Sequence, residues 1–402
     1  MINNSSAIPS QNTVLPDINN TEIAFRGKSN EDLNRAYWLF KIISSNFLTK
    51  IGPPLTNLAM KWGLPITNLI KKTIFAQFCG GETINESEAA IESLARGGVG
   101  TILDYSVEGE QEERSFIATA EEILSIIRKA KGDERIPLTV FKPTGIARFA
   151  LLEKVSAKVT LTTAEQAEYF KVKARVNQIC KLAHDLDVPV MIDAEESWIQ
   201  NAIDDMALEM MNNYNRERVI VYNTYQLYRN DKLASLKADI LKAESEGFIL
   251  GAKLVRGAYM EKERERAAKM GYPSPINADK AATDNDYNAA IRFCMEHLSS
   301  TAFLAGTHNE DSCRLLAELI AQYGLPQNHP HVYFSQLLGM SDNLSFNLGH
   351  AGYNVTKYVP YGPVKSVLPY LFRRAEENTS IAGQTSRELN LIITEKKRRR
   401  KS

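Results

Sequence analysis

The sequence predicts an α/β protein, a (βα)8 TIM-type barrel preceded by an N-terminal α-helical arm. Eight short, apolar, β-branched runs recur along the chain, and longer amphipathic stretches separate them. Strands buried on both faces read as continuous apolar runs, and their alternation with helices indicates a parallel sheet. A doubly wound open sheet has the same alternation, but neither a G-x-G-x-x-G nor a G-x-x-x-x-G-K-[ST] loop follows any of the runs. Because open nucleotide-binding sheets carry such loops, a barrel is favoured.

The N-terminal part of the chain reads as two regions. Residues 1–30 are rich in Asn, Ser and Pro, which predicts a flexible N-terminus. They lack a basic start with an apolar middle, so they resemble neither a secretory signal nor a basic transit peptide. In residues 31–96, Leu33, Tyr37 and Phe40 recur at helical spacing, which predicts an α-helical arm.

The barrel is expected over residues 97–380, and residues 381–402 form a C-terminal segment with a basic tail at 396–401. Stretches such as 164–187 and 284–298 between the runs have the pattern of amphipathic helices. The predicted strands are 98–103, 136–141, 188–192, 219–222, 249–255, 301–305, 331–334 and 355–359.

Composition narrows the class of partner. The 402 residues are 44% hydrophobic and 24% charged, with 48 basic and 48 acidic side chains, the profile of an ordinary globular protein. A formal net charge of +0 gives no general attraction to nucleic acid. The four cysteines are scattered without C-x-x-C pairs, and no apolar run is long enough to span a membrane. We therefore expect no nucleic-acid partner and no metal.

Polar residues collect at or just past the carboxyl ends of the predicted strands. In a barrel these ends converge on one mouth, where active sites are built. The sequence therefore predicts a pocket lined by Asp104, Lys142, Asp193, Asn223, Arg256 and His308.

The stretch YLFRRAEEN (370–378) follows the last predicted strand and should form the eighth helix. At about 100° per residue, Tyr370, Arg373, Arg374 and Glu377 share one face. One interpretation is a solvated stripe in which Arg373 and Glu377 form an i,i+4 ion pair. The other is that two guanidinium groups clamp a carboxylate or phosphate at the barrel mouth.

KLVRGAY (253–259) is the second informative stretch. Lys253 and Arg256, three residues apart on a strand, face opposite sides. Gly257 lets the backbone approach a flat ligand, which Tyr259 can cover. A lone lysine on a barrel strand also suits a Schiff-base aldolase, and Asp193 could instead cap the helix that starts near Ser197.

Taken together, the motifs resemble the proline dehydrogenase family, the FAD-dependent enzymes that begin proline breakdown. Each motif alone is modest, but the joint pattern, in order from residue 141 to 378, is very specific. The motifs are FKPTG (141–145), MIDAEES (191–197), YNTYQ (222–226), KLVRGAY (253–259), GTHN (306–309), QLLGM (336–340), KYVPYGPV (357–364) and YLFRRAEEN (370–378).

The resemblance implies a distorted (βα)8 barrel and a substrate site. By it, Arg373 and Arg374 bind the proline carboxylate, Lys142 is a third cationic partner, Glu377 holds this cluster, and Asp193 braces the site. The residues that resemble the walls around the pyrrolidine ring are Tyr259, Leu337, Tyr358 and Tyr370.

The resemblance also implies FAD contacts, at Asn223, Gln226, Lys253, Val255, Arg256, Gly257, Ala258, Thr307 and His308. Three positions, Asn223, Lys253 and Arg256, depart from the long bifunctional bacterial relatives, which typically carry a glutamine at the first and read R-L-V-K-G where this chain reads K-L-V-R-G. The motif sequences are closer to those of the single-function branch, which is found also in mitochondria. The length leaves no room for the aldehyde dehydrogenase half of the bifunctional enzymes. Tyr358 would crowd a 4-hydroxyl group, so proline should be preferred over hydroxyproline.

The implied reaction is hydride transfer from C5 of L-proline to N5 of FAD, giving Δ1-pyrroline-5-carboxylate on the route to glutamate. The expected electron acceptor is a membrane quinone, and the basic tail is a candidate for peripheral membrane contact. The expected location is the bacterial cytoplasm, peripheral at the inner membrane, with mitochondria as the alternative. Two other functions stay open, a Schiff-base aldolase using Lys253 and a non-catalytic carboxylate-binding protein.

Overall fold

The computed structural model describes residues 16–43, 66–107, 111–380 and 384–401, and it describes no side chains over 375–385. At its centre is a closed barrel of parallel strands in sequence order, β1 to β8. The predicted fold class is confirmed. The strands are β1 (Gly100–Tyr105), β2 (Leu138–Phe141), β3 (Val190–Ile192), β4 (Val221–Gln226), β5 (Leu250–Val255), β6 (Thr301–Gly306), β7 (Val332–Leu337) and β8 (Val355–Tyr361).

Pairing of β1 with β8, from Gly100 opposite Thr356 to Tyr105 opposite Tyr361, closes the barrel. Alternate residues along each strand point to opposite faces. The inward residues form a small apolar plug that includes Ile102, Leu138, Val140, Met191, Tyr222, Ala302, Leu304 and Tyr358. The outward residues join the larger core between strands and helices.

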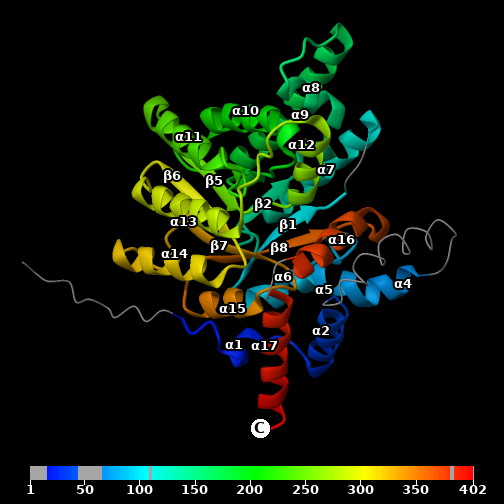
Figure 1. Ribbon diagram of the computed structural model, residues 1–402, viewed down its shortest axis with the longest axis vertical. Coiled ribbons are helices and arrows are strands. Elements are labelled where there is room, and N and C mark those ends of the chain that lie inside the picture. The colour runs from blue at the N-terminus through cyan, green and yellow to red at the C-terminus, as the bar shows by residue number, and fades with distance from the viewer. Residues whose placement is uncertain (1–15, 44–65, 108–110, 381–383, 402) are drawn as a thin grey trace, which may run out of the picture.

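Helices surround the barrel (Figure 1). Local sequence sets several of their ends: a capping box of Thr162 and Glu165 starts α9, and Asp187 in the left-handed conformation ends it. The helices are α6 (Glu88–Arg96), α7 (Glu113–Ala130), α8 (Phe149–Ser156), α9 (Thr163–Leu186), α10 (Ser197–Tyr214), α11 (Lys232–Glu246), α12 (Met260–Met270), α13 (Lys280–Glu296), α14 (Glu310–Gln322), α15 (Asp342–His350) and α16 (Val364–Ser380).

The remaining helices form what we call the terminal layer, where the first and last described helices meet (Figure 1). Its apolar core, with Phe25, Leu33, Phe40 and Leu391 among its members, also takes in the start of α16. Residues 16–30, which the sequence assigns to a flexible N-terminus, are packed here. The helices are α1 (Thr21–Ala24), α2 (Asn30–Ile43), α4 (Thr67–Ile70), the π-helix η1 (Lys71–Phe75), α5 (Ala76–Phe78) and α17 (Gln384–Arg399).

Two findings concern the described ranges alone. None of their helices combines the length and the apolarity that crossing a bilayer requires. Within the same ranges, no three His, Cys, Asp or Glu side chains come together in a way that could hold a metal ion.

Candidate active site

Asp193 lies at the centre of a charged cluster at the carboxyl ends of the strands. It follows β3, and its backbone N–H donates to the carbonyl of Phe141 at 3.0 Å, which continues the β2–β3 pairing. Its Oδ1 accepts from Lys253 Nζ at 2.5 Å. Its Oδ2 accepts from the Tyr358 hydroxyl at 2.8 Å and from Lys142 Nζ at 3.3 Å. One carboxylate thus joins β2, β3, β5 and β8.

Electrostatics keep this carboxylate ionised. Burial alone would raise the pKa of Asp193, but Lys253 and Lys142 outweigh it, so the net pKa is lowered. Burial raises the pKa of Tyr358 well above its usual range, so its phenol stays protonated and can donate. Both lysines also lie over the Tyr358 ring, with Nζ at 5.4 Å for Lys142 and 4.7 Å for Lys253 from the centroid.

Lys142 bridges to a second acid. Its Nζ donates to Asp104 Oδ2 at 3.1 Å and to the Tyr358 hydroxyl at 2.8 Å. The cluster therefore holds two ammonium groups and two carboxylates, which balance. An anionic ligand at this mouth needs a further cation.

Two arginines lie on α16, the predicted eighth helix. Arg374 is buried, with 7% of its surface exposed, and its guanidinium carbon lies 5.2 Å from the centroid of the Tyr370 ring. Arg373 beside it is half-buried. The burial of Arg374 does not fit a solvated stripe. Glu377 belongs to α16, but its side chain lies outside the described residues.

The run after β5 is the best place for a flat ligand. The strand is buried from Leu250 to Leu254, whereas residues 255–257 are partly accessible and Ala258 is exposed. Gly257 has a φ of +140°, and a Cβ built there would lie 2.3 Å from the Tyr228 ring. Only glycine fits that step, which lies two residues past the end of β5.

Arg256 and His308 flank this run. The Arg256 guanidinium donates to Asp284 at 2.8 Å, to Thr307 at 2.6 Å and to Ser312 at 3.1 Å. His308 Nδ1 lies 2.8 Å from Ser341 Oγ, and burial, with Lys357 and Arg374 nearby, lowers the pKa of His308 to about 3. His308 is thus neutral and Arg256 is held rigidly by protein partners.

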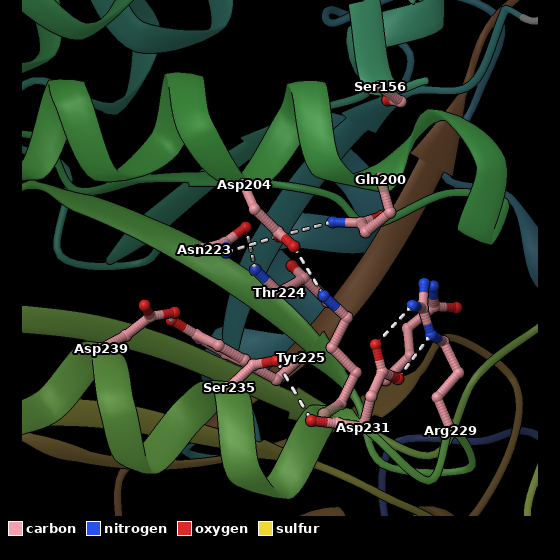
Figure 2. A network of polar contacts seen from close by, with 12 residues as sticks. Ser156, Gln200, Asp204, Asn223, Thr224, Tyr225, Arg229, Asp231, Ser235 and Asp239 are labelled. Atoms are coloured by element: carbon pink, nitrogen blue, oxygen red, sulfur yellow. Dashed lines mark hydrogen bonds and ion pairs between the residues drawn. The ribbon is translucent and has the colours of Figure 1, made fainter. Parts of the chain in front are cut away.

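Two predicted residues have other partners. Asn223 was expected just past a strand ending at residue 222, but β4 runs on to Gln226. Asn223 therefore points outward, where its amide donates to Asp204 of α10 at 2.9 Å (Figure 2). It does not join the mouth. The Gln226 side chain points to the inside of the barrel, and its amide donates to the carbonyl of Glu195 at 2.7 Å.

The apolar candidates lie around the cluster. Leu337 packs against both the barrel plug and the terminal layer, and Tyr370 belongs to the core of that layer. Tyr259 is buried immediately before α12. Several buried charges were missed from the sequence, among them Lys357, which is fully buried on β8 next to Tyr358. Its only signal is a lysine inside an apolar strand.

Comparisons with known proteins agree with this geometry. Residues 87–387 match the family described as "Proline dehydrogenase". The chain is 34% identical to "Proline dehydrogenase 1, mitochondrial" of Dictyostelium discoideum, over 97% of this chain and 76% of the relative. It is 43% identical to the protein of that name from Homo sapiens, over 59% of this chain and 40% of the relative.

One relative has a different name: "Carbapenem antibiotics biosynthesis protein CarD" of Pectobacterium carotovorum subsp. carotovorum is 34% identical over 80% of this chain and 83% of its own length. Among solved structures, proline utilization A from Bdellovibrio bacteriovorus superposes with a TM-score of 0.71 at 18% identity, covering 92% of this chain and 40% of that one. At that identity the likeness concerns the fold. The chain spans about two fifths of the human relative and of this solved chain.

Proposed function

The chain belongs to the proline dehydrogenase family, and we propose that it oxidises L-proline to Δ1-pyrroline-5-carboxylate, the first step of proline catabolism to glutamate. The observation that carries the proposal is the Asp193 cluster, in which two lysines and a phenol meet one buried carboxylate.

The donor chemistry of α16 supports an amino-acid anion as the ligand. Lys142 and Lys253 pair with Asp104 and Asp193. Arg373 and Arg374 of α16 carry guanidinium groups, and a guanidinium matches a carboxylate with two parallel donors. In the proposal these arginines bind the substrate carboxylate, Lys142 assists them, and Glu377, four residues after Arg373 on α16, orients them.

Tyr358 sets the shape of the pocket in this proposal. Its hydroxyl donates to Asp193 at 2.8 Å and accepts from Lys142 at 2.8 Å, so the ring cannot swing away without breaking both bonds. A fixed ring crowds a 4-hydroxyl group, which favours proline over hydroxyproline. The other walls of the ring pocket are Tyr259, Leu337 and Tyr370.

The residues present fit a flavin. The accessible run 255–258, its glycine step, the adjacent Lys253 ammonium, and the rigid Arg256 with Thr307 and neutral His308 offer a flat surface and donors for an anionic cofactor. We propose FAD, which supplies a hydride acceptor when bound. Gln226 stays a candidate contact, whereas Asn223 is left out because its amide is bonded to Asp204. The protein's own part is to hold the ring of proline in place and to neutralise its carboxylate.

The proposed electron acceptor is a membrane quinone. In the terminal layer, Trp38 and Ile42 of α2 are more than half exposed, at 58% and 51%. Lys396 of α17 lies over the ring of Tyr37, which belongs to α2, and its Nζ is 4.5 Å from the ring centroid. Exposed apolar side chains beside lysines suit peripheral contact with an anionic membrane surface. The names of the relatives favour mitochondria over a bacterial cytoplasm.

An absorbance spectrum of the purified protein before and after addition of L-proline tests the proposal. The expected result is a flavin spectrum that bleaches with proline and not with D-proline. A colourless protein without proline-dependent dye reduction would instead support a carboxylate-binding protein. Borohydride trapping of a carbonyl substrate on Lys253 would support the aldolase, although the Lys253 ammonium is bonded to Asp193 and is not presented as a free amine.

A further inference from the structure

The two loops that carry Lys142 and Asp193 are joined by a second carboxylate. Glu195 lies two residues after Asp193, and its side chain reaches the turn that follows Lys142. Its Oε1 accepts from the backbone N–H of Thr144 at 2.9 Å, and its Oε2 accepts from the Thr144 hydroxyl at 2.5 Å. Only 4% of the Glu195 surface is exposed.

The turn that contains Thr144 is short, and hydrogen bonds fix it on both sides. Residues Pro143–Gly145 form one 3-10 turn, in which the Gly145 N–H donates to the carbonyl of Lys142 at 3.0 Å. On its far side, the Arg175 guanidinium donates to the carbonyl of Ile146 at 2.9 Å. Thr144 is therefore tied rigidly to Lys142, and a displacement of one moves the other.

Glu195 is itself fixed from behind. Its N–H donates to Gln200 Oε1 at 2.8 Å, and its carbonyl accepts from Gln226 at 2.7 Å. The Gln200 amide in turn donates to Asp204 at 2.8 Å (Figure 2). Asp204 also takes Lys232 Nζ at 2.6 Å, an ion pair between α10 and α11. The backbone and side chain of Glu195 are thus bonded at four points to groups that cannot easily move.

We infer that Glu195 is a positioning residue for substrate binding: through Thr144 it sets the place of the Lys142 ammonium relative to Asp193. The inference rests on the proposed function, in which Lys142 contacts the proline carboxylate. The carboxyl group suits this task because one of its oxygens lies at the N–H of Thr144 and the other at the Thr144 hydroxyl, so the loop is fixed in direction as well as in distance. Burial excludes water that would compete for those donors.

The test is proline oxidation by Glu195→Ala, Glu195→Gln and Thr144→Val, with KM and kcat measured separately. Glu195→Ala is expected to raise KM for proline roughly ten- to hundredfold, because a shift of about 1 Å in a positioning group has effects of that size. The kcat should change by less than about threefold, since the flavin side of the mouth is untouched. Glu195→Gln keeps the shape and one acceptor, and Thr144→Val keeps one of the two bonds, so both should raise KM by a smaller factor and still fold.

A double-mutant cycle separates this role from a structural one. In a Lys142→Met background, Glu195→Ala should raise KM no further, because its effect passes through Lys142. The matched control is Glu165→Ala, which removes a carboxylate bonded to the N–H and hydroxyl of Thr162, at 3.0 and 3.1 Å, away from the mouth. It should leave KM as in the parent.

Three results would overturn the inference: unchanged KM in Glu195→Gln and Thr144→Val with proline oxidation intact in the parent, an equal KM change in the control, or additivity with Lys142→Met. Failure of the parent protein to oxidise proline would instead contradict the proposed function.

Discussion

Among the residues that the structure describes, two buried aspartates each bind two lysines, one at the mouth and one at the terminal layer. Asp193 binds Lys142 and Lys253, at 3.3 and 2.5 Å. Asp342, at the start of α15, binds Lys28 and Lys357 at 2.6 and 3.0 Å. For both, burial would raise the pKa and the lysines lower it, in the case of Asp342 to about 2. The electrostatic unit is the same in the two regions.

What stands beside each unit differs. The Asp193 unit includes the Tyr358 phenol, and its Lys253 lies on the strand that ends in the partly accessible run 255–258. The Asp342 unit is enclosed: Lys357 also donates to the carbonyls of Leu337 and Met340, and Lys28 brings the N-terminal segment onto the barrel. Lys357 and Tyr358 are neighbours on β8, so strand alternation alone sends one to the layer and the other to the mouth. A buried charge cluster therefore indicates a ligand site only where accessible groups complete it.

The largest expected effect separates the two units by activity. Asp193→Ala leaves two ammonium groups without their shared carboxylate, and we expect it to abolish proline-dependent flavin reduction and to lower the free energy of unfolding by about 3–5 kcal/mol. Urea denaturation and flavin absorbance measure the two effects. Asp193→Asn, which keeps the shape, should also lose activity; full activity in Asp193→Asn would contradict the role of the charge.

Asp342→Ala is the matching change in the terminal layer. It removes the same kind of buried pair, so we expect a similar loss of about 3–5 kcal/mol in urea denaturation. The KM for proline of the folded fraction should stay within about threefold of the parent, because nothing in this unit is proposed to touch substrate. If Asp342→Ala also lost proline-dependent flavin reduction, the two regions would not be functionally separate.

The sequence predicted the mouth well for a physical reason. Strand order and the convergence of strand ends in a barrel are enough to bring Asp104, Lys142 and Asp193 together, as the hydrogen bonds of Lys142 confirm. The failure at Asn223 came from an error in a strand end, since moving the end of β4 from 222 to 226 turns that side chain to the outer face.

The contacts of the terminal layer could not be predicted from strand order. Pairs such as Lys28 with Asp342 join residues more than 300 positions apart, and no period in the sequence encodes them. The grip of Glu195 on Thr144 was also hidden, because MIDAEES equally suits a capped helix start. The residues of such contacts can be read from the sequence, but their partners follow only from the packed structure.

Two buried glutamates, one in each region, should make the stability of the protein depend on pH. Burial raises the pKa of Glu195, at the mouth, from an ordinary 4.5 to about 8, and that of Glu388, in the terminal layer, to about 7. Between pH 4.5 and these values the folded protein keeps protons that the unfolded chain has released, so the stability from each glutamate is lost as pH rises. The expected slope is about 1.4 kcal/mol per pH unit for each proton.

Melting temperatures across pH 5–9 measure this dependence. Glu388→Gln should remove the loss of stability that occurs up to about pH 7. Glu195→Gln should remove the loss of stability that continues to about pH 8. Glu388 accepts from the Ser341 N–H at 2.6 Å, a bond that glutamine can keep, so the variant should fold. An unaltered pH profile in both variants would show that neither glutamate holds a raised pKa.

The smallest expected effect lies at the end of α17, where Arg399 fastens the two chain ends. Its guanidinium donates to the carbonyls of Phe25 and Lys28 at 2.7 and 2.8 Å and to Glu395 at 2.7 Å. Because these bonds lie near the surface, Arg399→Ala should lower the free energy of unfolding by only about 1–2 kcal/mol. The effect should be measurable as faster amide hydrogen exchange in residues 21–33.

Proline oxidation by Arg399→Ala should equal that of the parent, because α17 reaches the barrel by a second route, the bond from Ser341 to Glu388. Arg398→Ala is the comparison variant, since it removes a neighbouring guanidinium that bonds the same Glu395 and pairs with Glu22 at 3.4 Å but touches neither carbonyl. Faster exchange over 21–33 in Arg399→Ala alone would show that its two carbonyl bonds hold this segment. Equal exchange in both variants would assign that role to the side-chain bonds with Glu395 and Glu22 instead, and a loss of activity in either would mean that the terminal layer shapes the mouth.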